Sequence, residues 1–308
     1  MNSLNDNQYI EDPGPFEARY LAFLETISTL RPSLHRYCAR MTGSVMDGED
    51  VVQEALLEAY RKLDKFDDSR PLKPWLFRIA HNRCIDFLRR KGVRAQAESA
   101  ATAPEAVLPV EPATLGIGEA VEHLVLTLPP KERVCVLLKD VFDYSLEEIA
   151  ELVDSTVGGV KAALKRGRSK LAALPEHAAP PRKRDESETR LLRLYIERFN
   201  RRDWDGVREL ISADARLAVA DRFLGPMSES PYFGNYEDLR VEWRMALGEV
   251  DGEPVIVRLD REQDHWKPRS FVRLSVKNGQ IIGIVDYWHC PWVLPAAASI
   301  VVDQSLPN

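Results

Sequence analysis

The sequence predicts three domains: two all-helical modules followed by a mixed α+β domain. From Phe16 to about residue 91, and again over residues 119–174, apolar residues recur at helical spacing. From about residue 188 onward, helical patterns give way to short segments rich in Val, Ile and aromatic residues, which is typical of an α+β domain. The 308 residues suffice for two or three domains.

The net charge of −6 hides a strong regional asymmetry. Residues 1–60 hold ten acidic against four basic residues, whereas residues 61–94 hold eleven basic against four acidic residues. Residues 185–308 are acidic again, with twenty-one acidic and sixteen basic residues. Such an arrangement indicates different partners for different parts of the chain.

The sequence indicates a cytoplasmic protein with reduced thiols. No apolar run approaches membrane-spanning length, and the polar start MNSLNDNQYIEDPG is not typical of a signal peptide. The four cysteines are scattered and form no C-x-x-C pair. They are Cys38, Cys84, Cys135 and Cys290.

Two His/Cys pairs raise the question of a metal site. HRYC (His35, Cys38) and HNRC (His81, Cys84) each have i, i+3 spacing, so together they could supply four tetrahedral ligands. Both pairs lie in amphipathic helices, where cysteine is usually buried packing. We therefore expect no metal here.

The first module reads as helices throughout. FEARYLAFLETISTLRPSLHRYCARMTG predicts a helix with a break at Pro32 and a stop at Gly43. DGEDVVQEALLEAYRKL predicts a second helix, whose acidic first turn suits the helix dipole. After the loop DDSRPLKP, WLFRIAHNRCIDFLRRK predicts a third helix, closed by Gly92.

The second module has the pattern of a helix-turn-helix. Ser145 and Glu148 form a capping-box arrangement ahead of a short helix that ends at Val153. After the turn DST, with Ser155 or Thr156 as the cap, a basic helix follows. A basic helix in second place can enter the major groove, although an isolated basic helix is usually a solvated face. Its lysines and arginines are Lys161, Lys165, Arg166, Arg168 and Lys170.

Two segments rich in Ala and Pro read as linkers, and the last third of the chain reads as helices and then strands. The linkers are AQAESAATAPEAVLPVEPATLGIG and PEHAAPPRKRDES. ETRLLRLYIERFNRRDWDGVRELIS predicts two helices, ARLAVA a strand and NYEDLRVEWRMAL a further helix. The strands EPVIVRLD, PRSFVRLSVKNG and QIIGIVDYWHC follow, with KNGQ as a hairpin turn.

Three motifs in residues 16–174 together resemble the extracytoplasmic-function (ECF) sigma factors of bacterial RNA polymerase. They are DGEDVVQEALLEAYRKL, PWLFRIAHNRCIDFLRRK and LPPKERVCVLLKDVFDYSLEEIAELVDSTVGGVKAALKRGRSKL. All three occur in the family's order and spacing, so the signal is stronger than one helix-turn-helix. The resemblance implies a polymerase-binding module, called region two, and a promoter-reading module, called region four.

The resemblance also implies residue roles. In the family, the D-x-E-D-x-V-Q-E helix docks on the clamp helices of polymerase, and the matching residues here are Asp47, Asp50, Gln53 and Glu54. A dipole-stabilised helix start would explain Asp47 and Glu49 but not the whole set. Residues 66–90 correspond to the minus-ten reader and melting element, where unpaired bases are held over a basic groove. The residues expected on DNA there are Ser69, Arg70, Lys73, Arg78, Asn82, Arg83, Arg89 and Arg90, while Trp75 is expected in the core.

In the second module, the resemblance places the basic helix on the minus-thirty-five element. Ala162 and Ala163 stand where relatives often carry Ser or Arg, so we expect more reliance on phosphate contacts and duplex shape. The residues expected on DNA are Thr156, Gly158, Lys161, Lys165, Arg166 and Arg168.

Residues 188–294 resemble a SnoaL-like domain, a cone of curved sheet and helices around a pocket, on the pattern YIERFNRRDWDGVRELIS followed by DARL. Some members of that superfamily are enzymes that use an Asp or His. No acid–base pair is evident by spacing, so we assign no catalytic residue and no cofactor. SESPYFGNY and YWHCPW could line a ligand pocket or meet the helical modules, and we favour the interface. The candidate acids and bases are Asp221, Asp286, His265 and His289.

The sequence therefore favours a promoter-specificity subunit that binds core RNA polymerase and both double- and single-stranded promoter DNA. Two alternatives stay open: a SnoaL-like enzyme or sensor of a small-molecule ligand with a DNA-binding front half, and a helix-turn-helix regulator that acts without polymerase. The second alternative leaves the first two motifs unexplained. The expected domains are region two (1–94), a linker (95–118), region four (119–174), a linker (175–187), the SnoaL-like domain (188–294) and a tail (295–308).

Overall fold

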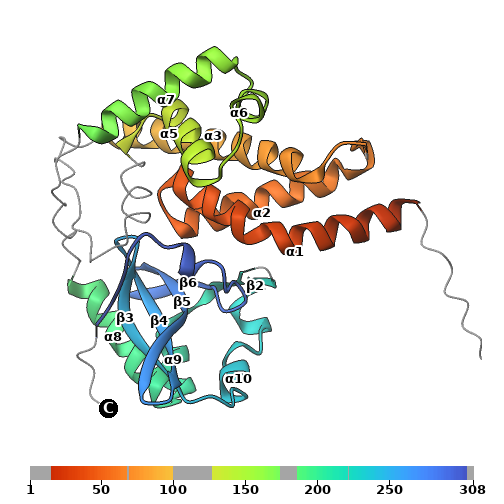
Figure 1. Cartoon of the computed structure of the whole chain (residues 1–308). Coiled ribbons are helices and arrows are strands. Elements are labelled where there is room, and N and C mark those ends of the chain that lie inside the picture. The colour runs from red at the N-terminus through yellow and green to blue at the C-terminus, as the bar shows by residue number, and fades with distance from the viewer. Residues whose placement is uncertain (1–14, 68, 100–126, 174–185, 221, 304–308) are drawn as a thin grey trace, which may run out of the picture.

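The computed structural model describes residues 15–67, 69–99, 127–173, 186–220 and 222–303. The helical modules lie on one side of the molecule and the sheet domain lies on the other, with α1 and α2 the helices of these modules that face the sheet domain (Figure 1). Both predicted linkers fall largely outside the described residues. Among the residues described, no helix has the length and apolar character needed to cross a membrane.

Region two is built from α1 (Pro15–Thr42), α2 (Val45–Arg61) and α3 (Leu72–Ser99). The predicted stop at Gly43 is confirmed, because α1 ends at Thr42 and Gly43 has a φ of 90°. Ser44 then caps α2 by accepting hydrogen bonds from the backbone N–H groups of Met46 and Asp47.

The predicted break at Pro32 is wrong, because α1 runs through it. A proline inside a helix costs about 3 kcal/mol. Phe23, Leu34 and Tyr37 lie on either side of Pro32 and are all buried, and burial of each such side chain contributes roughly 1.5–3 kcal/mol. Packing of these side chains on both sides of Pro32 therefore outweighs the free-energy cost of a proline inside the helix.

The predicted stop at Gly92 is also wrong, because α3 continues to Ser99. No atom lies within 4 Å of the position that a Gly92 Cβ would occupy. Glycine in an open helix interior costs only about 1 kcal/mol relative to alanine, and the residues that follow, VRAQAES, include good helix formers.

Gly48 brings α1 and α2 unusually close. A Cβ at this position would lie 2.6 Å from both the Cα and the N of Ala39. Backbone atoms cannot yield as a flexible side chain can, so Gly48→Ala must push the two helices apart. We expect this variant to lower the free energy of unfolding by about 1–3 kcal/mol in chemical denaturation.

Gly92→Ala is the matched control for that experiment. It adds the same methyl group to a helix interior where there is open space. The higher helix propensity of alanine should raise the free energy of unfolding by up to about 1 kcal/mol. Equal stabilisation by the two substitutions would contradict the close contact at Gly48.

Region four consists of α5 (Pro130–Val136), a π-helical extension (Leu137–Val141), α6 (Leu146–Leu152) and α7 (Val157–Ala172). The predicted capping box at the start of α6 is confirmed: Ser145 accepts from the Glu148 N–H, and Glu148 accepts from the Ser145 N–H. Thr156, one of the two predicted candidates, caps α7 by accepting from the Gly159 N–H.

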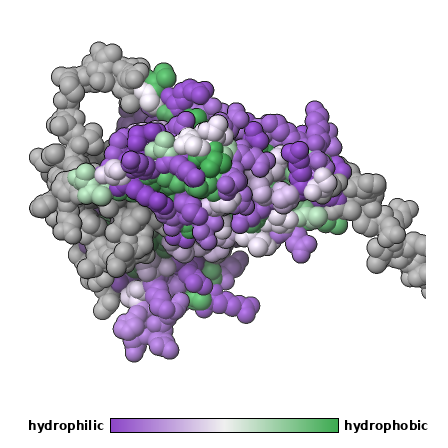
Figure 2. Space-filling view, turned by 45° about the horizontal axis from the view of Figure 1, so that its top comes forward, coloured by the Kyte–Doolittle hydropathy of each residue, from purple (hydrophilic) through white to green (hydrophobic). Residues whose placement is uncertain are grey.

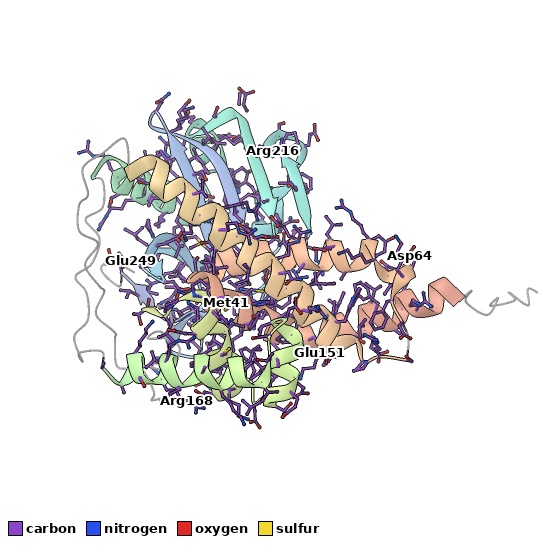
Figure 3. All side chains as sticks on the ribbon, turned by 90° about the horizontal axis from the view of Figure 1, so that it is seen from above. Met41, Asp64, Glu151, Arg168, Arg216 and Glu249 are labelled. Carbon is purple, nitrogen blue, oxygen red and sulfur yellow. The ribbon has the colours of Figure 1, made fainter. Side chains whose placement is uncertain are left out.

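Regions two and four share one hydrophobic core. The ring of Tyr37 on α1 lies 5.9 Å from that of Phe142, and the ring of Phe77 on α3 lies 5.7 Å from that of Tyr144. Met41, fully buried, lies where the helices of the two modules meet (Figure 3), and its carbonyl accepts a hydrogen bond from Arg133. In this structure the modules are packed together and are not two separate lobes.

The C-terminal domain has the predicted α+β architecture. Among the residues described, seven strands form one sheet in the order β2-β1-β6-β5-β4-β3-β7, in which β1 and β6 pair in parallel and the other neighbours are antiparallel. The hairpin predicted at KNGQ is confirmed, with positive φ at Asn278 and Gly279. The elements are α8 (Glu186–Asn200), α9 (Trp204–Glu209), β1 (Ile211–Val219), β2 (Phe223–Pro226), α10 (Tyr232–Glu237), β3 (Trp243–Val250), β4 (Glu253–Glu262), β5 (His265–Lys277), β6 (Gln280–Asp286) and β7 (Ile300–Val302).

The helix predicted over NYEDLRVEWRMAL is only partly correct. Its first residues close α10, but Trp243–Val250 form β3, paired along its whole length with β4. Met245 and Leu247 belong to one core and Ala246 to another, so side chains alternate between the two faces of the sheet. Pairing with β4 therefore overrides the local helical pattern.

The two faces of the sheet bury different partners. One face packs against α8 and α10, through side chains such as Tyr195, Phe199 and Tyr236. The other face packs against the end of α1 and the start of α2, where Ala39, Val45 and Met46 join the core. The sheet therefore forms a direct interface with region two.

Candidate functional site

The acidic face of α2 is largely paired within the protein. The Asp47 Oδ2 lies 3.0 Å from the Lys91 Nζ, and the Glu54 Oε2 lies 3.5 Å from the Arg90 Nη2. Ion pairs at the protein surface contribute at most about 1 kcal/mol. Two residues expected on polymerase thus pair with basic residues of α3, through contacts that a partner could replace.

Glu49 is the buried centre of the contact between α2 and the C-terminal domain, which we call the α2 joint. From its place in the sequence, only a part in a dipole-stabilised helix start is expected. Its carboxylate is fully buried. It accepts hydrogen bonds from Arg31, from Gln53 and, at 2.9 Å, from the indole Nε1 of Trp292. The guanidinium of Arg31 also lies 4.9 Å from the centre of the Trp292 ring. Trp292 is 243 residues from Glu49, so no local pattern could reveal this pairing.

Asp251 ties the first residue of α2 to the sheet domain. Its Oδ2 accepts a 3.0 Å hydrogen bond from the Val45 N–H, one of the N-terminal donors that a helix leaves free. Its Oδ1 accepts from the N–H groups of Ala298 and Ser299. A carboxylate at this position also suits the helix dipole. The C-terminal domain therefore caps the helix that carries the polymerase motif.

Several carboxylates lie close together at the α2 joint. Asp50 is exposed at the surface, yet desolvation by the neighbouring protein raises the pKa of its carboxyl to about 6, with contributions from Asp47, Glu49 and Glu54. Arg273 acts in the opposite direction. Burial likewise raises the pKa of Glu253.

A cavity of about 430 Å³ lies beside α3 and is lined by three of the eight residues predicted for the minus-ten element. Asn82 and Arg89 are exposed within it, and Arg83 is half-buried. The Arg83 Nε bonds to the Glu58 carboxylate, which fixes the side chain at the wall. His81 also lines the cavity, and burial lowers the pKa of its imidazole to about 4. The structure thus brings Asn82, Arg83 and Arg89 together.

The remaining predicted residues of region two are more dispersed. Ser69 and Arg70 both contact Asp67 in an exposed turn, whereas Arg78 is exposed on α3. Lys73 lies over the ring of Tyr144, at 5.6 Å from its centre, and so takes part in the contact with region four.

Trp75 has the core role predicted for it. Its ring packs against Phe66, with ring centres 4.7 Å apart, and against the shared core.

The basic helix α7 divides into two groups of side chains. Arg166 and Lys170 both bind the carboxylate of Glu132, and Arg168 binds that of Asp140. These three contacts hold α7 against α5 and its extension. Lys161 and Lys165 are exposed, as is the helix start at Gly158.

The outer face of the helical modules stays accessible. Figure 2 shows a predominantly hydrophilic surface with an apolar group near its middle and smaller ones toward its edges, and Arg168 lies on the outer edge of α7 in Figure 3.

The candidate acids and bases of the C-terminal domain do not form a catalytic pair in the described residues. Asp286 is fully buried and accepts hydrogen bonds from the hydroxyls of Tyr232 (2.9 Å) and Tyr236 (2.6 Å) and from the Trp288 N–H. Burial raises the pKa of Asp286, which these donors oppose. His289 stacks on Trp288, His265 is exposed at the start of β5, and Asp221 lies outside the described residues.

The prediction that two aromatic segments meet the helical modules is half right. YWHCPW does so through Trp292 and Cys290. SESPYFGNY instead places its aromatic rings in the core around Asp286, away from region two.

The two His/Cys pairs do not come together as a set of metal ligands. The described part of the chain contains no cluster of three or more metal-ligating side chains. His35 contacts the Val45 carbonyl at 2.9 Å, and His81 contacts the Tyr37 hydroxyl at 2.9 Å. Cys38 and Cys84 are buried thiols.

Known proteins match the helical modules closely. The family model Sigma-70 region 2 matches residues 26–94, and Sigma-70, region 4 matches residues 118–171. The ECF RNA polymerase sigma factor SigW of Bacillus subtilis is 35% identical over 162 residues, which cover 49% of this chain and 87% of SigW. The chain belongs to the ECF RNA polymerase sigma factor family.

Other ECF sigma factors differ in how much of the chain they match. SigG of Mycobacterium tuberculosis is 30% identical over 229 residues, covering 65% of this chain and 62% of SigG. The crystal structure of SigJ from the same species is 19% identical, covers 85% of this chain and 95% of SigJ, and has a TM-score of 0.36. The sigma factor RpoE from Bartonella quintana, solved with the anti-sigma factor NepR, is 25% identical, covers 49% and 94%, and has a TM-score of 0.41.

Family membership excludes the regulator that acts without polymerase. As an ECF sigma factor, the chain is a transcription initiation factor that binds RNA polymerase and promoter DNA, and not an enzyme. The sequence motifs of residues 16–174 thus led to the correct family.

Proposed function

We propose that this ECF sigma factor directs promoter-dependent initiation in the cytoplasm and that its C-terminal domain restrains it by holding the first turn of α2. Core polymerase would bind through Asp47, Asp50, Gln53 and Glu54. The observation that carries the proposal is the α2 joint, in which Trp292 bonds Glu49 and Asp251 caps Val45. The restrained helix is the one that carries the polymerase motif.

Separation of regions two and four is the second step of the proposed mechanism. The minus-ten and minus-thirty-five elements lie about 25 base pairs apart, or roughly 85 Å along the duplex at ~3.4 Å per base pair. The two modules share one core here, so they must come apart to span that distance. Polymerase and promoter would supply the free energy for this opening by binding only the open form.

The cavity beside α3 would hold an unpaired base, with Asn82 on the base edge and Arg83 and Arg89 near the phosphates. The other predicted contacts of this element are Ser69, Arg70, Lys73, Arg78 and Arg90.

Run-off transcription with core polymerase tests the proposal. The full chain should support initiation only on templates that carry its promoter. A chain that binds promoter DNA but never supports initiation with core polymerase would contradict the proposed function.

Lys165→Ala should weaken promoter binding and reduce its salt dependence. Lys165 is exposed on α7, and each phosphate contact contributes about −0.9 to the slope of log K against log[salt]. We therefore expect the slope to fall by about one in fluorescence anisotropy titrations with duplex promoter DNA. Lys161→Ala should behave in the same way.

Arg166→Ala is the informative comparison, because the Arg166 Nε lies 2.9 Å from a Glu132 carboxylate oxygen. If Arg166 mainly holds α7 against α5 through this ion pair, Arg166→Ala should change the salt slope of promoter binding less than Lys165→Ala does. An unaltered slope in both lysine variants would show that α7 does not lie on the phosphate backbone.

A further inference from the structure

We infer that a cavity at the boundary between α1 and the C-terminal domain binds a small planar aromatic carboxylate. The cavity measures about 230 Å³ and lies between Pro32, Arg36 and Arg40 of α1 and the segment that contains Trp292 and Pro295. It is distinct from the core around Asp286 and from the cavity beside α3. We call it the α1 cavity.

The charge of the α1 cavity favours an anion. Arg36 and Arg40 are one helical turn apart, so both guanidinium groups belong to the same side of α1. Both also make other contacts within the protein, so a ligand would join an existing network. Guanidinium groups match carboxylates through two parallel hydrogen bonds. The nearby carboxylate of Glu49 is already engaged by Arg31 and Trp292.

The remaining walls favour a flat ring. Two prolines, two alanines and the Trp292 indole make most of the lining apolar. Aromatic rings pack on indole and proline faces with little conformational cost. The volume lies below the roughly 300–1,000 Å³ typical of sites for drug-sized ligands, so it suits one ring with one carboxylate.

The position of the α1 cavity predicts an effect on activity, and this step depends on the function proposed above. Trp292 lines the cavity and also bonds Glu49 in the α2 joint. A ligand held between α1 and the Trp292 segment would bind only while the joint is closed. At one hundred times its Kd, such a ligand would increase the ratio of closed to open molecules about a hundredfold.

The first arm of the test measures binding alone, with the full chain and no polymerase. Benzoate and 4-hydroxybenzoate should bind with one-to-one stoichiometry in isothermal titration calorimetry and change the tryptophan fluorescence. Phenol, which lacks the carboxylate, and cyclohexanecarboxylate, which lacks the flat ring, should each bind at least tenfold more weakly. Equal binding of all four probes, or none at millimolar concentration, would overturn the inference.

Arg36→Gln supplies the matching variant. Arg36 is exposed, so the fold should tolerate the change, and the affinity for benzoate should fall at least tenfold. Arg216→Gln is the control, since Arg216 is an exposed arginine of β1 on the sheet domain (Figure 3) and does not line the cavity. Loss of binding in both variants, or in neither, would contradict the assignment.

The second arm measures run-off transcription with and without 4-hydroxybenzoate. The inference expects less transcript with the ligand and no such decrease in Arg36→Gln. Unchanged transcription despite binding would overturn the coupling to the α2 joint. Failure of the proposed function itself would be visible separately, as absence of initiation without any ligand.

Discussion

Trp292→Ala should raise the affinity of the full chain for core RNA polymerase by about tenfold or more. The substitution removes the 2.9 Å hydrogen bond to Glu49 and the ring that lies against Arg31. A hydrogen bond to a charged group is worth about 1.5–3 kcal/mol, and each 1.4 kcal/mol changes an equilibrium constant tenfold. The closed form loses this contribution and the open form does not, so the equilibrium shifts toward the form that polymerase binds.

Trp266→Ala provides the control for that measurement. Trp266 also packs against arginine side chains, with Arg244 at 4.5 Å from its ring centre. It borders the core beneath the joint but takes no part in the hydrogen bonds to Glu49 or Val45. Its replacement should leave polymerase affinity within twofold of the parent. If Trp292→Ala binds polymerase no better than Trp266→Ala, the joint does not restrain α2.

Acidic pH should stabilise the closed form, and a rise of pH through about 6 should weaken it. The pKa of Asp50 is about 6 in the closed form, and desolvation is the largest cause, ahead of the opposing charge of Arg273. Opening would relieve the desolvation that the C-terminal domain supplies, so the pKa would fall toward its ordinary value of 3.8, although Asp47, Glu49 and Glu54 stay beside it on α2. The closed form therefore binds more protons between about pH 4 and pH 6, so its stability falls as pH rises through that window. One proton can change the closed-to-open ratio by at most about tenfold per pH unit. The exposed edge of Asp50 lets water screen its charge and reduces this effect.

Hydrogen exchange of the first turn of α2 would measure this pH dependence directly. Protection, corrected for the intrinsic exchange rate, should decrease from pH 5 to pH 7, and Asp50→Asn should flatten the decrease. Burial lowers the pKa of His35 in the closed form, so this group would favour the closed form as the pH rises, which is opposite to the effect of Asp50. Its bonding partner, the Val45 carbonyl, lies in the same module, so opening of the joint changes His35 less. Protection that rises with pH would contradict the role of Asp50.

Local signals in the sequence predicted the local features of the fold. The capping box at Ser145, the stop at Gly43 and the turn at Asn278 each depend on residues only a few positions apart. The errors arose where tertiary packing outweighs local preference. Pro32 is tolerated because α1 is anchored by buried side chains on both sides of it, and Trp243–Val250 form a strand because β4 pairs with them.

The candidate site was predictable in composition but not in its contacts. The motifs located the acidic face of α2 and the basic helix α7. They could not show that Arg166 and Arg168 are engaged by Glu132 and Asp140, or that Glu49 meets Trp292. Such contacts join positions 28 to 243 residues apart, and the spacing of residues within one helix carries no information about them.

The second face of the sheet has a consequence for the lifetime of the active form. Val250, Val257 and Phe271 on the sheet share one buried core with Val45 and Met46 of region two, and opening of the α2 joint would divide this core. Opening would expose complementary apolar surfaces on the two parts to water. Without polymerase to capture it, an open molecule would reclose, or exchange its C-terminal domain with a neighbour and accumulate as swapped dimers. The concentration of free polymerase in the cell would then determine how long each open molecule remains able to bind polymerase.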